Sequence, residues 1–347
     1  MGFPRFKSKR RATPSCTFTT GAIRVAADRH HVTLPVIGTI KTHESTRKLA
    51  RRLEAETARI TTATIRFERD RWFVSFVTHV QRSLHRLAHV CAGEPVVGVD
   101  LGVKDLLVIA TPEGREIARI PPPGHLRHAQ RKLRALQRKA ARQRGPWDCV
   151  GQSRRQPSTG WKTTQTEIGK THARVANLRA DHLHKTTTRL AQTHSLIGVE
   201  TLAVRNMTRH GGARKRGLNR SLTDASFATI ARLLDYKTRW YGAQLVRADR
   251  FYPSSKTCST CGAVKTKLTL AERTYICTTC GSAIDRDLNA AINLARLAQA
   301  SLDETTAGSG SVVTGGADDK PKHSLVRGHE TGTPAPPGTA TPQGAAA

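Results

Sequence analysis

The segment that decides the fold reads VVGVDLGVKDLLVIATPEGREIARI and spans residues 96–120. It contains two apolar runs and a shorter third, which turn-forming residues such as Pro112-Glu113-Gly114 separate. Runs of β-branched and aliphatic residues bounded by turn signals predict three strands joined as a meander. The first run, VVGVD, ends in Asp100. Because an aspartate at a strand end is usually a turn former, this residue alone does not assign a site.

A second carboxylate ends a second apolar run. The segment SLIGVE (195–200) is a short strand of the buried type, and its last residue is Glu200. Burying a carboxylate beside such a run is costly unless something neutralises its charge. Since two strands share this design, the turn-former interpretation is weakened for both. Acids at the C-terminal ends of such strands are typical of the ribonuclease-H-like α/β fold, which we expect here.

A third acid opens a predicted helix at 285–299, whose faces differ in character. One row is apolar beyond its first residue and consists of Asp287, Ala291, Leu294 and Ala298. Another row is polar throughout and consists of Asp285, Asn289, Asn293 and Arg296. The apolar row should face the sheet. We therefore expect Asp287 at the core edge beside the other two acids, and Asp285 as a helix cap.

Asp100, Glu200 and Asp287 together form a candidate catalytic metal site. Three carboxylates suffice to hold two Mg²⁺ ions about 3.5–4 Å apart, one activating a water and the other stabilising the leaving 3′-oxygen. Hard oxygen ligands suit Mg²⁺ or Mn²⁺. The pattern therefore predicts an enzyme that cuts phosphodiester bonds.

Four cysteines indicate a second, different metal centre. Cys258 and Cys261 form one CxxC pair, Cys277 and Cys280 form another, and 15 residues separate the pairs. This spacing predicts a zinc ribbon. A zinc ion with four cysteine ligands has no open coordination position, so the zinc should be structural. A glycine follows each pair directly, where a tight turn favours a residue without Cβ.

Charge points to a polyanionic partner. The chain carries 57 Lys and Arg against 26 Asp and Glu, a formal net charge of +31. Neutralising phosphates releases counterions, which favours nucleic acid. No segment approaches the ~20 apolar residues of a membrane-spanning helix, and the start of the chain lacks the apolar region of a signal peptide. We expect a cytoplasmic protein whose thiols stay reduced.

The remaining segments give coarser expectations. β-Branched and aromatic patterns predict strands through 22–82, with a short helix at 45–57. Basic amphipathic helices are expected at 124–143 and 168–193, with a loop at 145–165 between them. The segment from 301 onward is rich in Gly, Thr, Ala and Pro and is expected to be disordered.

Several stretches resemble the TnpB (OrfB) proteins of bacterial insertion sequences. They are GFPRFKSKRR (2–11), GVDLGVKDL (98–106), ANLRADHLHK (176–185), GVETLAVRNM (198–207), DYKTRWYGAQLV (235–246), YPSSKTCSTCG (252–262) and CTTCGSAIDRDLNAAINLA (277–295). The last four together are highly specific. The resemblance implies an RNA-guided DNA endonuclease whose RuvC nuclease triad is Asp100, Glu200 and Asp287, with a zinc ribbon at the four cysteines.

The resemblance also implies a domain plan. Residues 1–90 look like part of the family's wedge β-barrel, which grips guide RNA and duplex DNA. Residues 91–300 would form the RuvC-like domain with the ribbon inserted at 252–284, and 301–347 the disordered tail. Family members usually carry a further wedge strand and a recognition domain before the GFPRFKSKRR stretch, so this chain is expected to be short at its N-terminus, through a late start or a truncation. The loop at 144–165 also departs from the family pattern.

Three functions remain open at this level. The first is an RNA-guided, Mg²⁺-dependent DNA endonuclease whose guide RNA comes from the transposon end. The second is a strand-transfer transposase, which the same three acids could serve, although a ribbon between the second and third acids is unusual for such enzymes. The third is a non-enzymatic nucleic-acid-binding relic. The sequence gives neither the guide, the target-adjacent motif nor the oligomeric state.

Overall fold

The computed structural model describes residues 13–19, 22–68, 71–81, 95–144, 147–148, 153–154, 157–209, 212, 215–269 and 271–307. The basic segment 2–11 and residues 308–347 of the predicted tail lie outside this set. Within the described residues, no helix is both long and apolar enough to cross a membrane.

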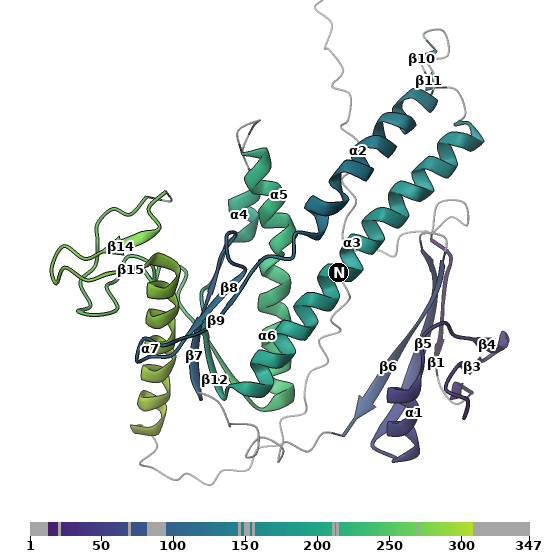
Figure 1. Ribbon diagram of the computed structural model, residues 1–347. Coiled ribbons are helices and arrows are strands. Elements are labelled where there is room, and N and C mark those ends of the chain that lie inside the picture. Colours follow the sequence, from purple (N-terminus) through teal and green to yellow (C-terminus); the bar gives the residue numbers. More distant parts are fainter. Residues whose placement is uncertain are drawn as a thin grey trace, which may run out of the picture. The chain divides into compact units, whose positions relative to one another are not determined.

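Two small antiparallel sheets and one helix form the N-terminal part (Figure 1). The first sheet has the order β1 (Ser15–Thr19), β5 (Ala58–Glu68), β6 (Arg71–Val80). The second has the order β2 (Arg24–Val25), β3 (His31–Leu34), β4 (Gly38–Lys41). Val32 and Leu34 of β3 pack with Ala63 and Ile65 of β5 in one small core. The expected short helix is confirmed as α1 (Arg47–Glu54).

A five-stranded mixed sheet organises the rest of the described chain. Its order is β13 (Gln244–Arg247), β12 (Leu196–Val199), β7 (Val96–Leu101), β8 (Leu107–Ala110), β9 (Glu116–Ile120). The strands β7, β8 and β9 pair antiparallel, so the predicted meander is confirmed. The strand β12 pairs parallel with both β7 and β13. The three parallel strands therefore end at the same edge of the sheet.

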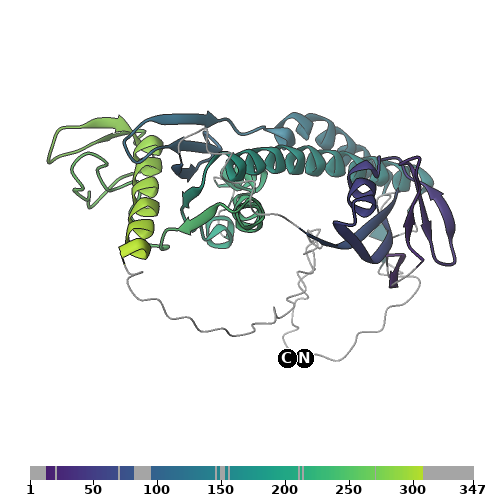
Figure 2. The same ribbon diagram turned by 90° about the horizontal axis from the view of Figure 1, so that it is seen from below.

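Side chains alternate between the two faces of this sheet, and different helices cover each face. Val97 and Val99 of β7 pack in one core with residues of α3 (Thr159–Thr193) and α6 (Phe227–Tyr241). Val96 packs instead against Ala298 of α7 (Arg286–Ala307). Figures 1 and 2 show α7 against one face, with α3 and α6 against the other. Because side chains alternate with period two, Gly98 and Asp100 share the α7 face with Val96.

Six shorter elements and one long helix complete the described fold. The shorter elements are α4 (Val204–Arg209), α5 (Arg216–Ala225), β10 (Trp147–Asp148), β11 (Ser153–Arg154) and the hairpin of β14 (Thr274–Ile276) with β15 (Ala283–Asp285). The helix α2 (His125–Gln143) packs along α3.

The loop prediction for 145–165 is wrong in its last residues, because α3 already begins at Thr159. Ser158 caps that start by accepting a hydrogen bond from the Trp161 N–H at 3.1 Å.

Candidate metal centres

Asp100 is buried in the central sheet. It is the fifth residue of β7, in register with Val108 of β8, and is 9 % exposed. Burial raises the pKa of Asp100 well above its ordinary value, and the negative charges of Glu200 and Asp287 raise it further. A carboxylate desolvated among other carboxylates strongly favours protonation or a bound cation.

Glu200 lies level with Asp100 on the neighbouring strand. It directly follows β12, whose Val199 is in register with Val99 of β7. Burial raises the pKa of Glu200 to about 7, although a hydrogen bond from the Leu101 backbone N–H acts in the opposite direction. The charge of Asp287 contributes to the rise. Two adjacent parallel strands therefore deliver one acid each to the same end of the sheet.

Asp287 is the second residue of α7, which covers the face that carries Asp100. The predicted apolar row of α7 is confirmed, because Ala291, Leu294 and Ala298 are fully buried. Asp287 thus comes from a third element to the sheet edge where the first two acids lie. The structure brings the three acids into electrostatic contact, although their oxygens do not all lie within 4.8 Å of one another.

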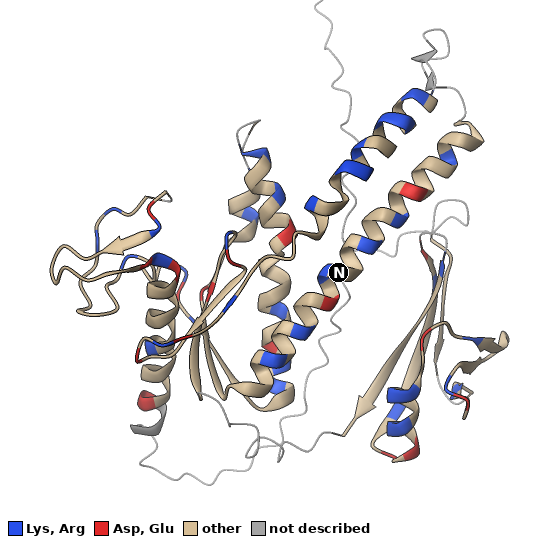
Figure 3. Ribbon diagram, in the orientation of Figure 1, with Lys and Arg blue, Asp and Glu red and all other residues tan. Residues whose placement is uncertain are grey.

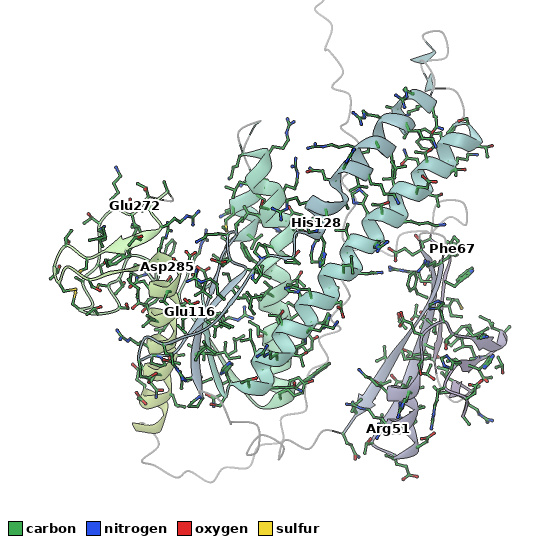
Figure 4. All side chains as sticks on the ribbon, in the orientation of Figure 1. Arg51, Phe67, Glu116, His128, Glu272 and Asp285 are labelled. Carbon is green, nitrogen blue, oxygen red and sulfur yellow. The ribbon has the colours of Figure 1, made fainter. Side chains whose placement is uncertain are left out.

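Asp285 has a different set of partners, as expected for a cap. Its Oδ1 accepts hydrogen bonds from the backbone N–H groups of Asp287 and Leu288, each at 3.0 Å. The Arg119 guanidinium also pairs with it, at 3.3 Å. Burial alone would raise the pKa of Asp285, but the Leu288 N–H and Arg119 outweigh it and lower this pKa. Figure 4 labels Asp285 beside the start of α7.

Arg119 is a residue that sequence reasoning missed. Its guanidinium spans from β9 to the start of α7, because it pairs with Asp105 at 2.9 Å, with Glu116 at 2.9 Å and with Asp285. This network fixes the entry of α7 beside the acidic site. Nothing in the sequence distinguished Arg119 from the many other cations, since its partner Asp285 lies 166 positions away.

The four cysteines converge as their spacing predicted. Among the described residues they are the group of metal-binding side chains whose ligand atoms all lie within 4.8 Å of one another. The Sγ atoms of Cys258 and Cys280 are 3.7 Å apart, and those of Cys261 and Cys277 are 3.6 Å apart. Tetrahedral zinc with Zn–S bonds of about 2.3 Å separates sulfurs by roughly 3.8 Å, so the cluster matches a closed zinc site.

The backbone around Cys277 also favours a thiolate. The N–H groups of Cys280 and Thr279 lower the pKa of Cys277 to about 6. The glycines after each pair, Gly262 and Gly281, have φ angles of +77° and +72°, which confirms the expected tight turns. A thiolate formed near neutral pH is the species that coordinates zinc.

The polar row of α7 docks this cysteine module. Asn289 is fully buried, accepts a hydrogen bond from the Ser259 N–H at 2.9 Å and donates one to the Thr257 carbonyl at 2.7 Å. Asn293 donates to the carbonyls of Ser254 and Thr257, and Arg296 donates to that of Ser259. The sequence showed this row as polar but gave no sign that it binds the first CxxC turn.

Basic side chains line the paired helices α2 and α3 (Figure 3). The helix α2 contains no Asp or Glu and carries Arg127, Arg131, Lys132, Arg134, Arg138, Lys139 and Arg142. The helix α3 adds Lys162, Lys170, Arg174, Arg179, Lys185 and Arg189. Buried Leu133 and Ala140 of α2 form the packed seam, so the cations of α2 face outward. Arg179 of α3 differs, because it pairs with Asp224 at 2.9 Å. Such a surface suits phosphates.

Two family models match the chain. The model OrfB_IS605, described as "Probable transposase", matches residues 75–210. The model described as "Cas12f1-like, TNB domain" matches residues 227–294. The first match contains Asp100 and Glu200. The second contains the four cysteines and Asp287.

Several curated proteins are similar over most of the chain. A "Putative RNA-guided DNA endonuclease" of Mycobacterium tuberculosis is 41% identical over 340 residues, which cover 96% of this chain and 70% of that protein. A protein of Streptomyces pristinaespiralis with the same description is 33% identical, over 84% of this chain and 64% of that protein. The InsQ protein of Escherichia coli K12, with the same description, is 27% identical and covers 84% and 67%.

Solved structures give weaker matches. A CRISPR-Cas12f ternary complex has a TM-score of 0.40 at 18% identity, covering 79% of this chain and 51% of that one. A Cas12f1–sgRNA–target DNA complex has a TM-score of 0.39 at 14% identity, covering 81% and 66%. The chain thus spans about half to two thirds of these structures.

Proposed function

Because this chain belongs to the OrfB (TnpB) family of transposon-encoded proteins, we propose that it is an RNA-guided, metal-dependent DNA endonuclease. The observation that carries the proposal is the approach of Asp100, Glu200 and Asp287 from three elements at one buried sheet edge, where two of them have raised pKa values. The family relationship is the basis for proposing an RNA guide and a DNA target.

The three carboxylates would hold two Mg²⁺ or Mn²⁺ ions. The fit rests on the donor set, which consists of hard carboxylate oxygens whose mutual repulsion a divalent cation would relieve. When bound, the ions would supply an activated water and charge stabilisation at the leaving oxygen. Asp100 and Glu200 are fixed by the sheet, and Asp287 by the seating of α7.

The strand order supports a ribonuclease-H-like, specifically RuvC-like, assignment. A three-strand antiparallel meander followed by two parallel strands beside its first strand carries Asp100 and Glu200 at one end. We infer that 91–300 is this nuclease domain with a zinc ribbon at 252–284, and that 1–90 is part of a wedge barrel. The expected disorder from 301 onward is wrong for residues 301–307, because α7 continues to Ala307.

Nucleic acid would bind along the cations of α2 and α3. Phosphate contacts from Arg and Lys fix register and orientation without reading sequence, which suits a protein whose specificity comes from base pairing with a guide. A guide RNA from the transposon end and a DNA target are the partners that we infer. The bacterial nucleoid would be the place of action.

The test is magnesium-dependent DNA cleavage by the full chain, loaded with the RNA that copurifies with it. Asp100→Asn, Glu200→Gln and Asp287→Asn should each lower cleavage by at least about 100-fold without loss of folding, as judged by circular dichroism. Asp303→Asn, farther along α7, is the matched control and should cleave normally. Full activity in any one of the three variants would remove that acid from the site.

The products separate this function from its alternatives. Hydrolysis with RNA-dependent choice of target supports the proposal. RNA-independent joining of transposon ends would instead identify a strand-transfer transposase. Tight DNA and RNA binding with no cleavage, by a wild type that binds Mg²⁺, would identify a non-catalytic binding protein.

A further inference from the structure

A hydrogen-bonded turn after β13 presents an aromatic ring to solvent. Phe251 is 83 % exposed, and the guanidinium carbon of Arg250 lies 5.6 Å from the centroid of its ring. The Phe251 N–H donates to the Asp249 carboxylate at 2.8 Å, and the Tyr252 N–H donates to the Asp249 carbonyl at 3.0 Å. The ring is therefore held outward by the fold of the turn.

This turn lies at the same end of the sheet as the candidate acids. Arg247 is in register with Val199, and the Ala248 N–H donates to the Val199 carbonyl at 2.8 Å. Ala248 is thus level with Glu200, and Phe251 follows three residues later, at most about 10–11 Å along the chain. The Tyr252 hydroxyl donates to the Asn293 carbonyl at 3.3 Å, which anchors the turn to α7.

The chemistry of the turn suits a nucleotide. An exposed phenyl ring leaves its apolar surface in water, so a partner that covers it is favoured. The adjacent guanidinium attracts an anion, and the carboxylate of Asp249 is engaged by the Phe251 N–H. A flat ring beside a cation matches a base beside its phosphate. Bases in a duplex are stacked on each other, so the matching partner is a single strand.

We propose that the turn at Arg250 and Phe251 holds one nucleotide of the single strand that enters the acidic site. Phe251 stacks on the base, and Arg250 binds the neighbouring phosphate. The contact tolerates any sequence because every base has a π face. This inference rests on the proposed nuclease function and adds a positioning contact to it.

Binding of a fluorescein-labelled 12-nucleotide thymidine strand to the zinc-loaded full chain, without magnesium, tests the proposal. Phe251→Ala should weaken this binding roughly 5- to 150-fold, and Phe251→Trp should restore it. On a 12-mer of abasic residues with the same backbone, wild type and Phe251→Ala should bind equally. Arg250→Gln should weaken binding to both strands.

Trp240 provides the control, because it is an exposed aromatic residue on α6, at the opposite end of β13. Trp240→Ala should leave both affinities unchanged. Equal binding of the thymidine strand by wild type and Phe251→Ala would overturn the proposal. So would an equal loss on the abasic strand, or a change in sedimentation showing that the ring joins two copies of the chain.

The binding assay also separates this inference from the nuclease proposal. If Asp100→Asn cleaves normally while Phe251→Ala loses base-dependent binding, the acidic site is wrongly assigned and the stacking contact stands. If Asp100→Asn is inactive and Phe251→Ala binds normally, only the stacking contact fails.

Discussion

Gly98 of β7 and Gly198 of β12 lie opposite each other in register, and α7 crosses both. A Cβ on Gly98 would lie 1.9 Å from the Ala291 carbonyl oxygen, and a Cβ on Gly198 would lie 2.2 Å from that of Leu294. The two glycines therefore form a groove that lets the α7 backbone approach the sheet. Asp287 reaches the acidic site because α7 lies in this groove.

Gly98→Ala should separate α7 from the sheet. The added methyl meets backbone atoms, which cannot rotate away, so we expect a loss of about 3 kcal/mol or more in unfolding free energy and loss of cleavage. Urea unfolding and the cleavage assay measure these effects. Gly169→Ala in α3 is the control, since nothing lies within 4 Å of its Cβ, and it should stabilise by about 0.5–1 kcal/mol. A stable, active Gly98→Ala would contradict the groove.

Asp100→Asn should stabilise the magnesium-free protein. In the folded state the ionised Asp100 is desolvated and repelled by Glu200 and Asp287. A neutral isostere removes both the desolvation cost and the repulsion. We expect roughly 1–3 kcal/mol, or about 3–10 °C in melting temperature by calorimetry. Magnesium should raise the melting temperature of the wild type more than that of the variant. A lower melting temperature for Asp100→Asn without magnesium would show that the acids do not repel.

Cys258→Ser should release zinc and weaken the attachment of the cysteine module to α7. The turn that contains Cys258 supplies the backbone groups that Asn289 and Asn293 bind, so its collapse leaves buried amides without partners. Zinc content measured by atomic emission should fall, together with the melting temperature. Cys16→Ser, at an exposed position in β1, should retain both. Unchanged zinc in Cys258→Ser would contradict the four-cysteine site.

Lys237 should make stability depend on alkaline pH. Its buried Nζ donates to the His184 carbonyl at 2.6 Å and to the hydroxyls of Thr187 and Thr188 at 2.8 and 2.7 Å. Desolvation lowers the pKa of Lys237 to about 8 from 10.5. Between these values the unfolded chain binds more protons than the folded chain, so this contribution to stability grows as pH rises.

Lys237→Met should remove that dependence. The unfolding free energy of the wild type, measured relative to Lys237→Met from pH 7 to 10.5, should rise by up to about 3 kcal/mol. Lys185→Met, at an exposed position on α3, should keep the wild-type profile. Parallel pH profiles for wild type and Lys237→Met would exclude a perturbed lysine.

Arg138→Gln should weaken DNA binding through charge alone. Arg138 is exposed on α2, where no acidic side chain neutralises it within the helix. One lost phosphate contact should reduce the slope of log K against log salt by about 0.9 for duplex DNA. Arg239→Gln, whose guanidinium pairs with Asp235 on α6, should leave the slope unchanged. Fluorescence anisotropy at several salt concentrations measures both.

The sequence by itself determined the features that local patterns encode. Apolar runs ending in Asp100 and Glu200 gave the meander and the parallel strand, because period-two burial and turn residues are readable over a few positions. Helical spacing placed Asp287 and Asp285 on different faces of the predicted helix, because residues three or four positions apart share one face. The CxxC spacing gave the four-cysteine cluster. The assignment of the three acids to catalysis stays a prediction.

Only the tertiary structure decided how these elements meet. The Gly98–Gly198 groove, the docking of Asn289 on the cysteine module and the bridge from Arg119 to Asp285 each join residues far apart in the chain. The exposed Phe251 owes its place to the register of β13 with β12. Which faces come together depends on packing across the whole sheet, so no local pattern could reveal these contacts.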